Sequence, residues 1–481
     1  MDYQKLKEAN DKFAFEQLKI DADKGHLFCQ YQVAMMYENG IGIEKNSEKA
    51  FEYYTKAANQ GHAISQTCLE NMYKNGIGTE KNLEKAFEYC EKAANQGHAG
   101  AQFKLAEMYK LGEGTAKNLK KAFEYFEKSA NQGHGIAQFD LGYMYKHGIG
   151  TAKNLEKSFE YLEKAANQGN AIAQFNLGYM YYFGEGTAKN LEKTFEYYEK
   201  AANQGHAGAQ FNLGYMYKHG EGTAKNLEKT FEYYEKAANQ GYAIAQYNLG
   251  NIYKLGEGIA KNLEKAFEYY EKAANQGHTN AQFNLAEMYK LGEGTAKNFE
   301  KSFEYIEKAA NQGNAKAQFN LALMYKYGEG TAKNLEKTFE YSEKAANQGN
   351  ANAQYNLGQM YRLGEERAKN MKKAFEYYEK AANQGYAKAQ FNLGQMYKLG
   401  EGRVKNMKKS FEYYEKAANQ GHAEAKIELE KLLSSKCESA NHSSAQLTQP
   451  IQPIAVKRPF ILTISESSAF SSAKKQAIQI D

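Results

Sequence analysis

Apolar residues recur along this chain with the spacing of amphipathic helices. One apolar face is formed by residues four, three and four positions apart: Leu191, Phe195, Tyr198 and Ala202. A second face follows after a short polar segment: Ala209, Leu213, Met216 and Tyr217. Spacings of three and four bring side chains to one side of a helix. The pattern therefore predicts two consecutive helices within residues 191–226.

Helix-ending residues bracket both segments. Asn190 precedes the first helix, where its side chain can cap free backbone N–H groups. Gly205 and Gly220 follow the two helices, at positions where a left-handed backbone conformation ends a helix. The polar segment GEGTAKN then leads into the next first helix. Together these signals predict a helix pair.

The same 36-residue segment is repeated along the chain without insertions. Full copies begin at Asp11, Ser47, Leu83, Leu119, Leu155, Leu191, Leu227, Leu263, Phe299, Leu335 and Met371, and a final half copy begins at Met407. A short helix cannot bury an apolar face alone, so neighbouring pairs must stack. A long coiled coil is excluded because glycines such as Gly61 and Gly97 recur at every helix end. We therefore expect an all-α solenoid with about eleven repeats.

The two ends of the chain depart from the repeat. Residues 1–24 are expected to form an N-terminal half-repeat helix, and residues 25–433 the solenoid. Residues 422–433 keep the spacing of a second helix but are more charged, as expected of a capping helix. Residues 434–481 contain ten Ser and all three prolines, so we expect a disordered tail. Its apolar segment, residues 451–464, is either a docking motif or part of a passive tail.

Charge and cysteine content narrow the class of partner and the compartment. Basic and acidic residues are nearly balanced, 62 against 57, and are interspersed, which does not favour nucleic acid as a partner. The chain has no apolar run of membrane-spanning length and no apolar signal core near its start. We expect no membrane insertion and a cytoplasmic location, with export without a cleaved signal as the alternative. Four irregularly spaced cysteines predict free thiols: Cys29, Cys68, Cys90 and Cys437.

The repeated motif A-x-A-Q-F-N-L-G-x-M-Y-x-x-G-x-G, followed by K-N-x-x-K-A-F-E-Y-Y-x-K-A-A-N-Q-G, resembles the Sel1-like repeat. That family is related to the tetratricopeptide repeat, and the resemblance covers about residues 11–433. It implies a right-handed α-solenoid of antiparallel helix pairs that serves as a protein-interaction scaffold. We further expect a monomer.

Two departures from the family pattern are visible. Tyr replaces the frequent Trp in the first helix, and Glu366 replaces the second glycine of its loop. If that loop position requires positive φ, Glu366 costs about 1 kcal/mol locally. Residues 362–370 should then show early hydrogen exchange.

One face of the second helix carries candidate ligand-binding residues. An Asn recurs there in seven consecutive units: Asn176, Asn212, Asn248, Asn284, Asn320, Asn356 and Asn392. By resemblance to tetratricopeptide proteins, this face lines the concave groove, and the Asn ladder would hold an extended peptide by its backbone. A side-chain amide has donors and an acceptor, so it can pair with a peptide N–H and C=O together. The alternative is that this Asn is a family consensus residue that serves packing.

Other positions of the same face vary between units, including Tyr179 and Tyr215, and would supply selectivity. Two lysines, Lys316 and Lys388, each lie one turn before an Asn of the set. This arrangement resembles half of the carboxylate clamp of some tetratricopeptide domains. The two lysines are two units apart with Asn352 between them, so solvated lysines are the alternative.

Most histidines follow the glycine that ends a first helix: His26, His62, His98, His134, His206, His278 and His422. They lie one or more units apart, too far to share a metal ion, so we interpret them as turn residues that cap the next helix. The Tyr and Phe stripes recur at core spacing in every unit and are interpreted as core rather than as base-stacking platforms. The sequence contains no nucleophile elbow, phosphate loop or H-E-x-x-H motif.

The sequence therefore predicts a non-enzymatic adaptor that binds protein or extended peptide segments in its groove, without cofactor or metal. One alternative is a hydrolase resembling the β-lactamase-like, cysteine-rich relatives of the family. Those relatives carry a disulfide in each repeat and a secretion signal, and this chain has neither pattern. A second alternative is an exported bacterial effector. RNA binding is disfavoured because Glu287, Leu291 and Leu323 occupy variable groove positions.

Overall fold

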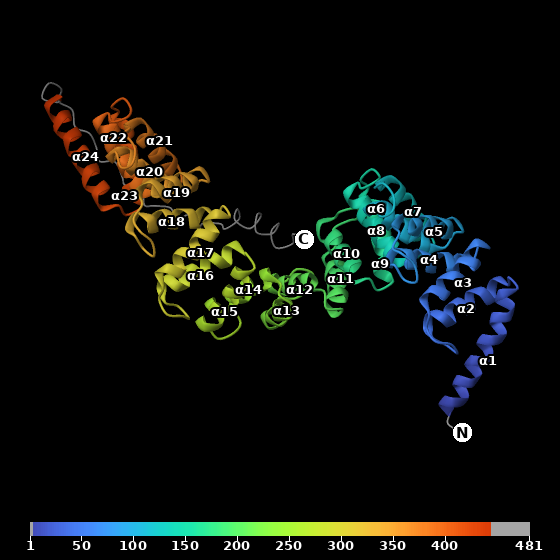
Figure 1. The fold of residues 1–481 in the computed structure, drawn as a ribbon. Helices are drawn as coiled ribbons and strands as arrows, with labels where there is room; N and C mark the ends of the chain where they lie inside the picture. Colours follow the sequence, from blue (N-terminus) through green and yellow to red (C-terminus); the bar gives the residue numbers. More distant parts are fainter. Residues whose placement is uncertain (1–2, 444–481) are drawn as a thin grey trace. The chain divides into compact units, whose positions relative to one another are not determined.

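The structure is a computed structural model that describes residues 3–443 (Figure 1). These described residues form 24 α-helices and no strand. Their contacts group into two compact units, Met1–Asn226 and Leu227–Asp481, which we call the N-terminal and C-terminal units. The expectation of an all-α fold with a 36-residue period is confirmed.

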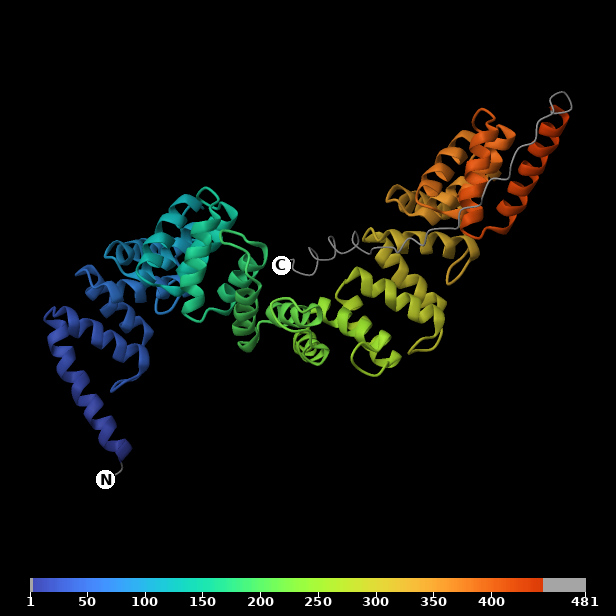
Figure 2. The same ribbon diagram turned by 180° about the vertical axis from the view of Figure 1, so that it is seen from behind.

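The N-terminal unit contains α1 (Tyr3–Asp23), α2 (Leu27–Asn39), α3 (Ser47–Asn59), α4 (Ala63–Asn75), α5 (Leu83–Asn95), α6 (Ala99–Leu111), α7 (Leu119–Asn131), α8 (Gly135–His147), α9 (Leu155–Asn167), α10 (Ala171–Phe183), α11 (Leu191–Asn203) and α12 (Ala207–His219). The C-terminal unit contains α13 (Leu227–Asn239), α14 (Ala243–Leu255), α15 (Leu263–Asn275), α16 (Thr279–Leu291), α17 (Phe299–Asn311), α18 (Ala315–Tyr327), α19 (Leu335–Asn347), α20 (Ala351–Leu363), α21 (Met371–Asn383), α22 (Ala387–Leu399), α23 (Met407–Asn419) and α24 (Ala423–Ser443). From α3 on, odd-numbered helices are the first helices of a repeat and even-numbered ones the second. Within each unit successive helices pack side by side, as the opposite view also shows (Figure 2).

Local caps set the helix boundaries. The Asn190 side chain accepts a hydrogen bond from the Lys193 N–H at 2.9 Å, at the start of α11. Gly205 in the turn between α11 and α12 has a φ of 89°, and Gly220 after α12 has a φ of 69°. Only a residue without Cβ adopts these angles at little steric cost. The three boundaries predicted from Asn190, Gly205 and Gly220 are confirmed.

A ladder of glutamines joins the turns of successive repeats. Gln204 Nε2 donates to Gln174 Oε1 at 2.7 Å, and Gln174 Nε2 donates to the Ala166 carbonyl at 3.1 Å. Gln174 is buried, so its amide depends on these protein partners. The C-terminal unit repeats the contact, with Gln384 Nε2 donating to Gln354 Oε1 at 2.8 Å. A buried polar contact thus ties the register of each repeat to that of the next.

The core is built from aromatic triads that span neighbouring helices. Tyr181 of α10 meets Phe159 of α9 edge-on, with ring centroids 5.2 Å apart, and stacks on Tyr197 of α11 at 5.8 Å. The Lys193 ammonium lies over the Tyr181 ring, 5.0 Å from its centroid. Such ring pairs add to the free energy of apolar burial. The interpretation of the aromatic stripes as core is therefore confirmed, with Tyr in the stack where the family often has Trp.

Residue size is matched across the seam between a second helix and the next first helix. Gly250 faces the Tyr270 ring, and a Cβ on this glycine would lie 2.5 Å from a ring carbon. Gly358 faces Tyr378 in the same way, at 2.6 Å. Where alanine replaces this glycine, at Ala286 and Ala322, the residue 20 positions later is smaller than Tyr: Ile306 and Ser342. The N-terminal unit departs from this match twice, since Ala34 is followed by Tyr54 and Ala106 by Phe126.

Glu366 is the one non-glycine residue with positive φ in the described chain, at 57°. Its equivalent one repeat later, Gly402, has a φ of 71°. The prediction that this loop position requires the left-handed conformation is confirmed. The strain expected at Glu366 follows from its Cβ.

The terminal helices differ from the repeated ones. α1 runs over Tyr3–Asp23 and agrees with the half-repeat helix expected over residues 1–24. α24 runs over Ala423–Ser443 and so continues past Leu433, where the capping helix was expected to end. The remaining part of the expected tail, including the apolar segment 451–464, lies outside the described residues.

Candidate interaction surface

The second helices of successive repeats present a common face. We define this second-helix face by the second, sixth, ninth and thirteenth positions of each second helix, which in α18 are Lys316, Asn320, Leu323 and Tyr327. Adjacent helices touch through these positions, since Asn320 Nδ2 donates to Glu287 Oε1 of α16 at 3.0 Å. A partner segment can therefore contact several repeats on one continuous surface within a unit.

The seven asparagines at the sixth position have different surroundings. Asn212 and Asn392 are buried, with 4% and 8% of their surface exposed. Asn176 and Asn248 donate to the carbonyl four residues earlier in their own helix, at 2.9 and 2.8 Å. Asn320 bonds the neighbouring second helix. These five amides already have structural surroundings that compete with a bound peptide.

Asn284 and Asn356 are half-buried members of the same set. Asn284 lies beside the Tyr270 hydroxyl, where it lowers the pKa of this phenol against the larger rise caused by burial. In the C-terminal unit the partly exposed asparagines of this set are therefore Asn248, Asn284, Asn320 and Asn356, whereas Asn392 is buried.

The other predicted site residues divide into exposed lysines and packed tyrosines. Lys316 and Lys388 are exposed, and neither has an ion-pair partner among the described residues. Tyr179 lies under the Lys146 ammonium, 4.5 Å from the ring centroid. Tyr215 packs on His219 with ring centroids 4.3 Å apart. Both tyrosines are half-buried.

Ion pairs between repeats follow the edge of this face, and the sequence analysis missed them. The basic residue at the twelfth position of a second helix meets the glutamate in the glycine loop of the next repeat. The pairs are Lys74–Glu113 at 2.6 Å, Lys146–Glu185 at 3.7 Å, Lys254–Glu293 at 3.6 Å, Lys290–Glu329 at 3.1 Å, Lys326–Glu365 at 3.8 Å and Arg362–Glu401 at 3.6 Å. The signal was the presence of GEG or GIG in the loop of the next repeat: the repeat after Lys110 has the GIG loop 148–150, and Lys110 pairs instead with Asp140 at 3.2 Å.

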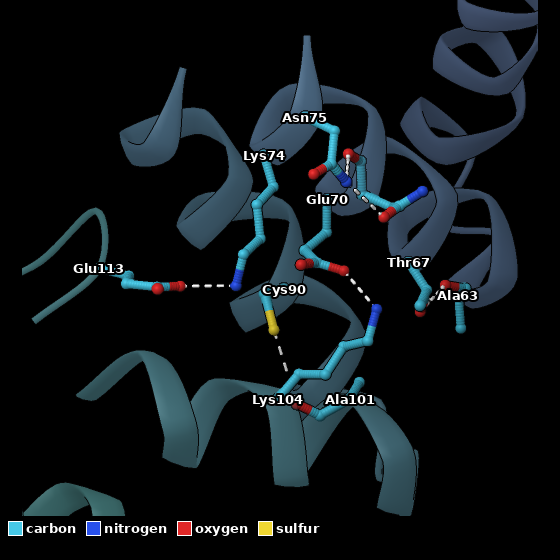
Figure 3. Close-up of polar contacts among 10 residues, drawn as sticks. Ala63, Thr67, Glu70, Lys74, Asn75, Cys90, Ala101, Lys104 and Glu113 are labelled. Atoms are coloured by element: carbon cyan, nitrogen blue, oxygen red, sulfur yellow. Dashed lines mark hydrogen bonds and ion pairs between the residues drawn. The ribbon is translucent and has the colours of Figure 1, made fainter. Parts of the chain in front are cut away.

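A charged cluster of the N-terminal unit includes Lys104, which occupies the sixth position of α6 on the second-helix face (Figure 3). Glu70 of α4 is buried, and its carboxylate points toward the ammonium of Lys104 in α6 at 2.5 Å. Cys90 of α5 lies beside it, with Sγ 3.6 Å from the Ala101 carbonyl. Burial raises the pKa of the Cys90 thiol to about 12, so the thiol stays protonated and acts as a packing residue.

An apolar row distinguishes the C-terminal unit. The thirteenth position of its five 13-residue second helices is large, apolar and 58–67% exposed: Leu255, Leu291, Tyr327, Leu363 and Leu399. The N-terminal unit carries mixed residues at this position: Asn39, Asn75, Leu111, His147, Phe183 and His219. Single exposed apolar residues are ordinary on protein surfaces, but aligned ones mark interaction sites.

The turn histidines act mainly as caps. His62, His134, His206, His278 and His422 accept a hydrogen bond through Nδ1 from the N–H three residues later, at 3.1–3.3 Å. Asn170, Asn314 and Asn350 do the same at the equivalent position. The capping interpretation is confirmed for these five histidines and is wrong for His26 and His98, which make no side-chain cap.

The described residues contain no cluster of His, Cys, Asp or Glu side chains arranged to hold a metal ion. Cys29, Cys68 and Cys90 are free thiols. Over the part of the chain that the structure covers, no helix combines the length and apolarity of a membrane-spanning segment.

The stacked helix pairs and the shared second-helix face define a helical tandem-repeat protein, a class typical of protein-interaction scaffolds. A family model for the Sel1 repeat matches eleven segments: 27–62, 67–98, 99–134, 135–170, 171–206, 207–242, 243–278, 279–314, 315–350, 351–386 and 387–422. The chain belongs to the Sel1 repeat family, as its motif indicated.

Two solved structures are similar over most of their own length. One is c5321 of uropathogenic Escherichia coli, described as a protective antigen with an SLR fold: 29% identity, 92% of this chain and 99% of that chain covered, TM-score 0.74. The other is a Sel1 repeat protein from Oxalobacter formigenes: 29% identity, 64% and 89% covered, TM-score 0.55. No curated protein matches the chain. These likenesses confirm the solenoid of helix pairs.

Proposed function

We propose that this Sel1 repeat protein is a non-enzymatic scaffold that binds protein or extended peptide segments along its second-helix face. The observation that carries the proposal is the apolar row of the C-terminal unit, five exposed side chains at one repeat position. Covering such side chains stabilises a complex by about 25 cal/mol per Å² of apolar surface removed from water.

The surface amides support binding of main chain next to this row. Asn284, Asn320 and Asn356 lie on three successive second helices of the C-terminal unit. Each amide has both donors and an acceptor, and Asn320 uses one N–H for Glu287, so the remaining groups of the series can satisfy an extended backbone independently of its sequence. The apolar row then selects among segments by their side chains.

Peptide selection on the full-length protein tests the proposal. Short random peptides displayed on phage are selected, and the affinities of the selected peptides are measured by fluorescence polarisation. We expect a Leu291→Ser/Leu363→Ser variant to weaken binding about tenfold or more, because two apolar contacts are lost. A Leu111→Ser/Ile136→Ser variant, with similarly exposed side chains in the N-terminal unit, is the matched control. Equal loss in both variants, or no selected peptide, contradicts the proposal.

The Asn ladder is tested by the same assay. An Asn284→Ala/Asn320→Ala/Asn356→Ala variant should weaken all selected peptides by a similar factor, since the amides would contact main chain. Circular dichroism must first show that the variant keeps its helices. Unchanged affinities would restrict these asparagines to packing.

We propose that the protein is a cytoplasmic monomer of 54.3 kDa. Light scattering on the purified chain tests the monomer. The alternative location, export without a cleaved signal, has support from the similar structure c5321, which is described as a protective antigen. Detection of the protein in cell fractions and culture medium of its source separates the two. Turnover of a chromogenic β-lactam by the purified chain would overturn the non-enzymatic assignment.

A further inference from the structure

A buried tyrosine at the eighth position of several first helices points its hydroxyl toward the second-helix face. In α15 this hydroxyl is satisfied, because Tyr270 donates to the Asn251 carboxamide oxygen at 2.7 Å. In α21 the equivalent Tyr378 is fully buried, and its hydroxyl makes no hydrogen bond of normal geometry, although the Asn392 and Arg362 side chains lie beside it. A buried hydroxyl without a partner costs free energy, so it marks a place where a ligand group can bind.

The difference between the two repeats comes from one residue. Gln359 stands in α20 where Asn251 stands in α14. The longer Gln359 side chain turns away and donates through Nε2 to the Tyr355 hydroxyl at 2.8 Å. The Tyr378 hydroxyl thereby loses the amide that its counterpart Tyr270 receives from within the chain.

A recess opens at this hydroxyl. It has a volume of about 350 Å³ and is lined by residues of α20, α21, α22 and the glycine loops, among them Gln359, Arg362, Lys369, Tyr378, Asn392 and Glu401. Leu363 of the apolar row also lines it. The recess therefore belongs to the same surface that we propose for peptide binding.

The polar groups of the recess define the chemistry of its ligand. Glu401 Oε2 is buried and makes no hydrogen bond, and Arg362 Nη2 lies 3.6 Å from it as an ion pair. The charges of Arg362 and Glu401 offset each other, while Lys369, which also lines the recess, is exposed to solvent. What it offers is one free donor, the Tyr378 O–H, and one free acceptor, the Glu401 carboxylate. A neutral group with one acceptor and one donor, a primary carboxamide, matches this pair.

We propose that this recess binds the carboxamide side chain of an Asn or Gln in a partner segment, whose neighbouring apolar side chain covers Leu363. The inference rests on the proposed function, since the segment must lie on the second-helix face. The contact of Asn251 with Tyr270 is its internal counterpart: the same hydroxyl position there holds a carboxamide supplied by the chain itself.

The test uses peptides selected from random phage-displayed sequences on the full-length protein. We expect the selected peptides to share an Asn or Gln beside an aliphatic residue. Replacing that Asn or Gln in the synthetic peptide by Asp, Glu or Ala should weaken binding about tenfold, because a buried polar group loses its partner. This change leaves the protein untouched and so cannot act through folding.

Two protein variants complete the test. Tyr378→Phe removes the free hydroxyl, and Gln359→Asn places a carboxamide against it as in α14; each should weaken the same peptides about tenfold. Tyr270→Phe is the matched control and should leave affinity unchanged, because that hydroxyl is already bonded. Thermal melting of Tyr378→Phe should be no lower than wild type, since the hydroxyl has no partner to lose.

The outcomes separate this inference from the function on which it rests. Peptides that bind without preference for Asn or Gln, or that bind Tyr378→Phe as tightly as wild type, overturn the carboxamide site and leave the scaffold intact. Failure to select any peptide contradicts the proposed function and this inference with it.

Discussion

The second-helix faces of the two units use the same positions in opposite ways. In the N-terminal unit, Lys104 and Asp140 occupy the sixth position and bind Glu70 and Lys110 of neighbouring second helices. In the five 13-residue second helices of the C-terminal unit the sixth position is Asn, and the thirteenth is an exposed apolar residue. The N-terminal face pairs these charged groups internally, whereas the C-terminal face exposes an apolar row, although Asn248 and Asn320 also bond within the chain. A repeat scaffold can thus assign stability to one region and binding to another without a change of backbone.

The largest expected effect comes from breaking the charged cluster of the N-terminal unit. Lys104→Met leaves the buried Glu70 carboxylate without its ion pair, and we expect the unit to lose about 3 kcal/mol. The matched change in the C-terminal unit is Lys316→Met, where the lysine is exposed and makes no ion pair, and it should change stability by less than about 0.5 kcal/mol. Urea unfolding followed by circular dichroism, with hydrogen exchange at α4 and α6, measures both. Similar losses of stability in the two variants would mean that the charged cluster does not distinguish the N-terminal unit from the C-terminal unit.

The glycine seam provides a second comparison. A Cβ at position 358 would lie 2.6 Å from the Tyr378 ring, so Gly358→Ala should destabilise the C-terminal unit by about 1–2 kcal/mol despite the better helix propensity of Ala. Gly142→Ala in the N-terminal unit meets the flexible Leu162 side chain at 2.8 Å and should cost less. Adding Tyr378→Ser to Gly358→Ala recreates the Ala322 and Ser342 pair and should recover part of the loss. A stabilised Gly358→Ala protein would show that the seam has room to adjust.

Much of the fold was predictable because each repeat carries its own local signals. Asn190, Gly205 and Gly220 encode helix ends through side-chain caps and positive φ, which depend only on neighbouring residues. The seam was also encoded, since residue size covaries over 20 positions, as in Gly358 with Tyr378. The division into two units was not predictable, because the repeat continues through the boundary in sequence.

The sequence predicted on which helix face the candidate site lies, but not the surroundings of its side chains. The periodicity placed Asn212 and Asn392 on the second-helix face, but their burial depends on neighbouring side chains of other helices. The free Tyr378 hydroxyl arises because Gln359 turns toward Tyr355, a rotamer choice that sequence spacing does not specify. The ion pairs at the GEG loops were encoded in sequence, but they join residues 39 positions apart, such as Lys74 and Glu113.

A pH titration should separate the units, because two turn histidines of the N-terminal unit have a lowered pKa and one in the C-terminal unit does. Burial lowers the pKa of His62 and His206, and of His278 in the C-terminal unit. A lowered folded-state pKa means that the unfolded chain takes up protons first as pH falls. The stabilising effect is therefore present above the ordinary His pKa of 6.5 and is lost as pH drops below it.

We expect melting to shift to lower temperature between pH 7.5 and about pH 5, with hydrogen exchange increasing more in the N-terminal unit. His206→Asn should reduce this pH dependence, since Asn170 makes the same cap without titrating at these pH values. Equal pH sensitivity of His206→Asn and wild type would assign the effect to other groups.

The smallest effect concerns the strained loop after α20. Glu366 holds a φ of 57°, and the equivalent position elsewhere in the described chain, as at Gly402, is a glycine with positive φ. Glu366→Gly removes the clash of Cβ with the backbone and should stabilise the C-terminal unit by about 0.5–1 kcal/mol. The larger conformational entropy of Gly in the unfolded chain reduces this gain. Hydrogen exchange over residues 362–370 should slow by a similar free energy, while the loop at Gly402 serves as the internal reference. The Arg367 guanidinium lies over the Phe339 ring, 4.6 Å from its centroid. Faster exchange in Glu366→Gly would mean that this contact stabilises the loop by more than the positive φ of Glu366 destabilises it.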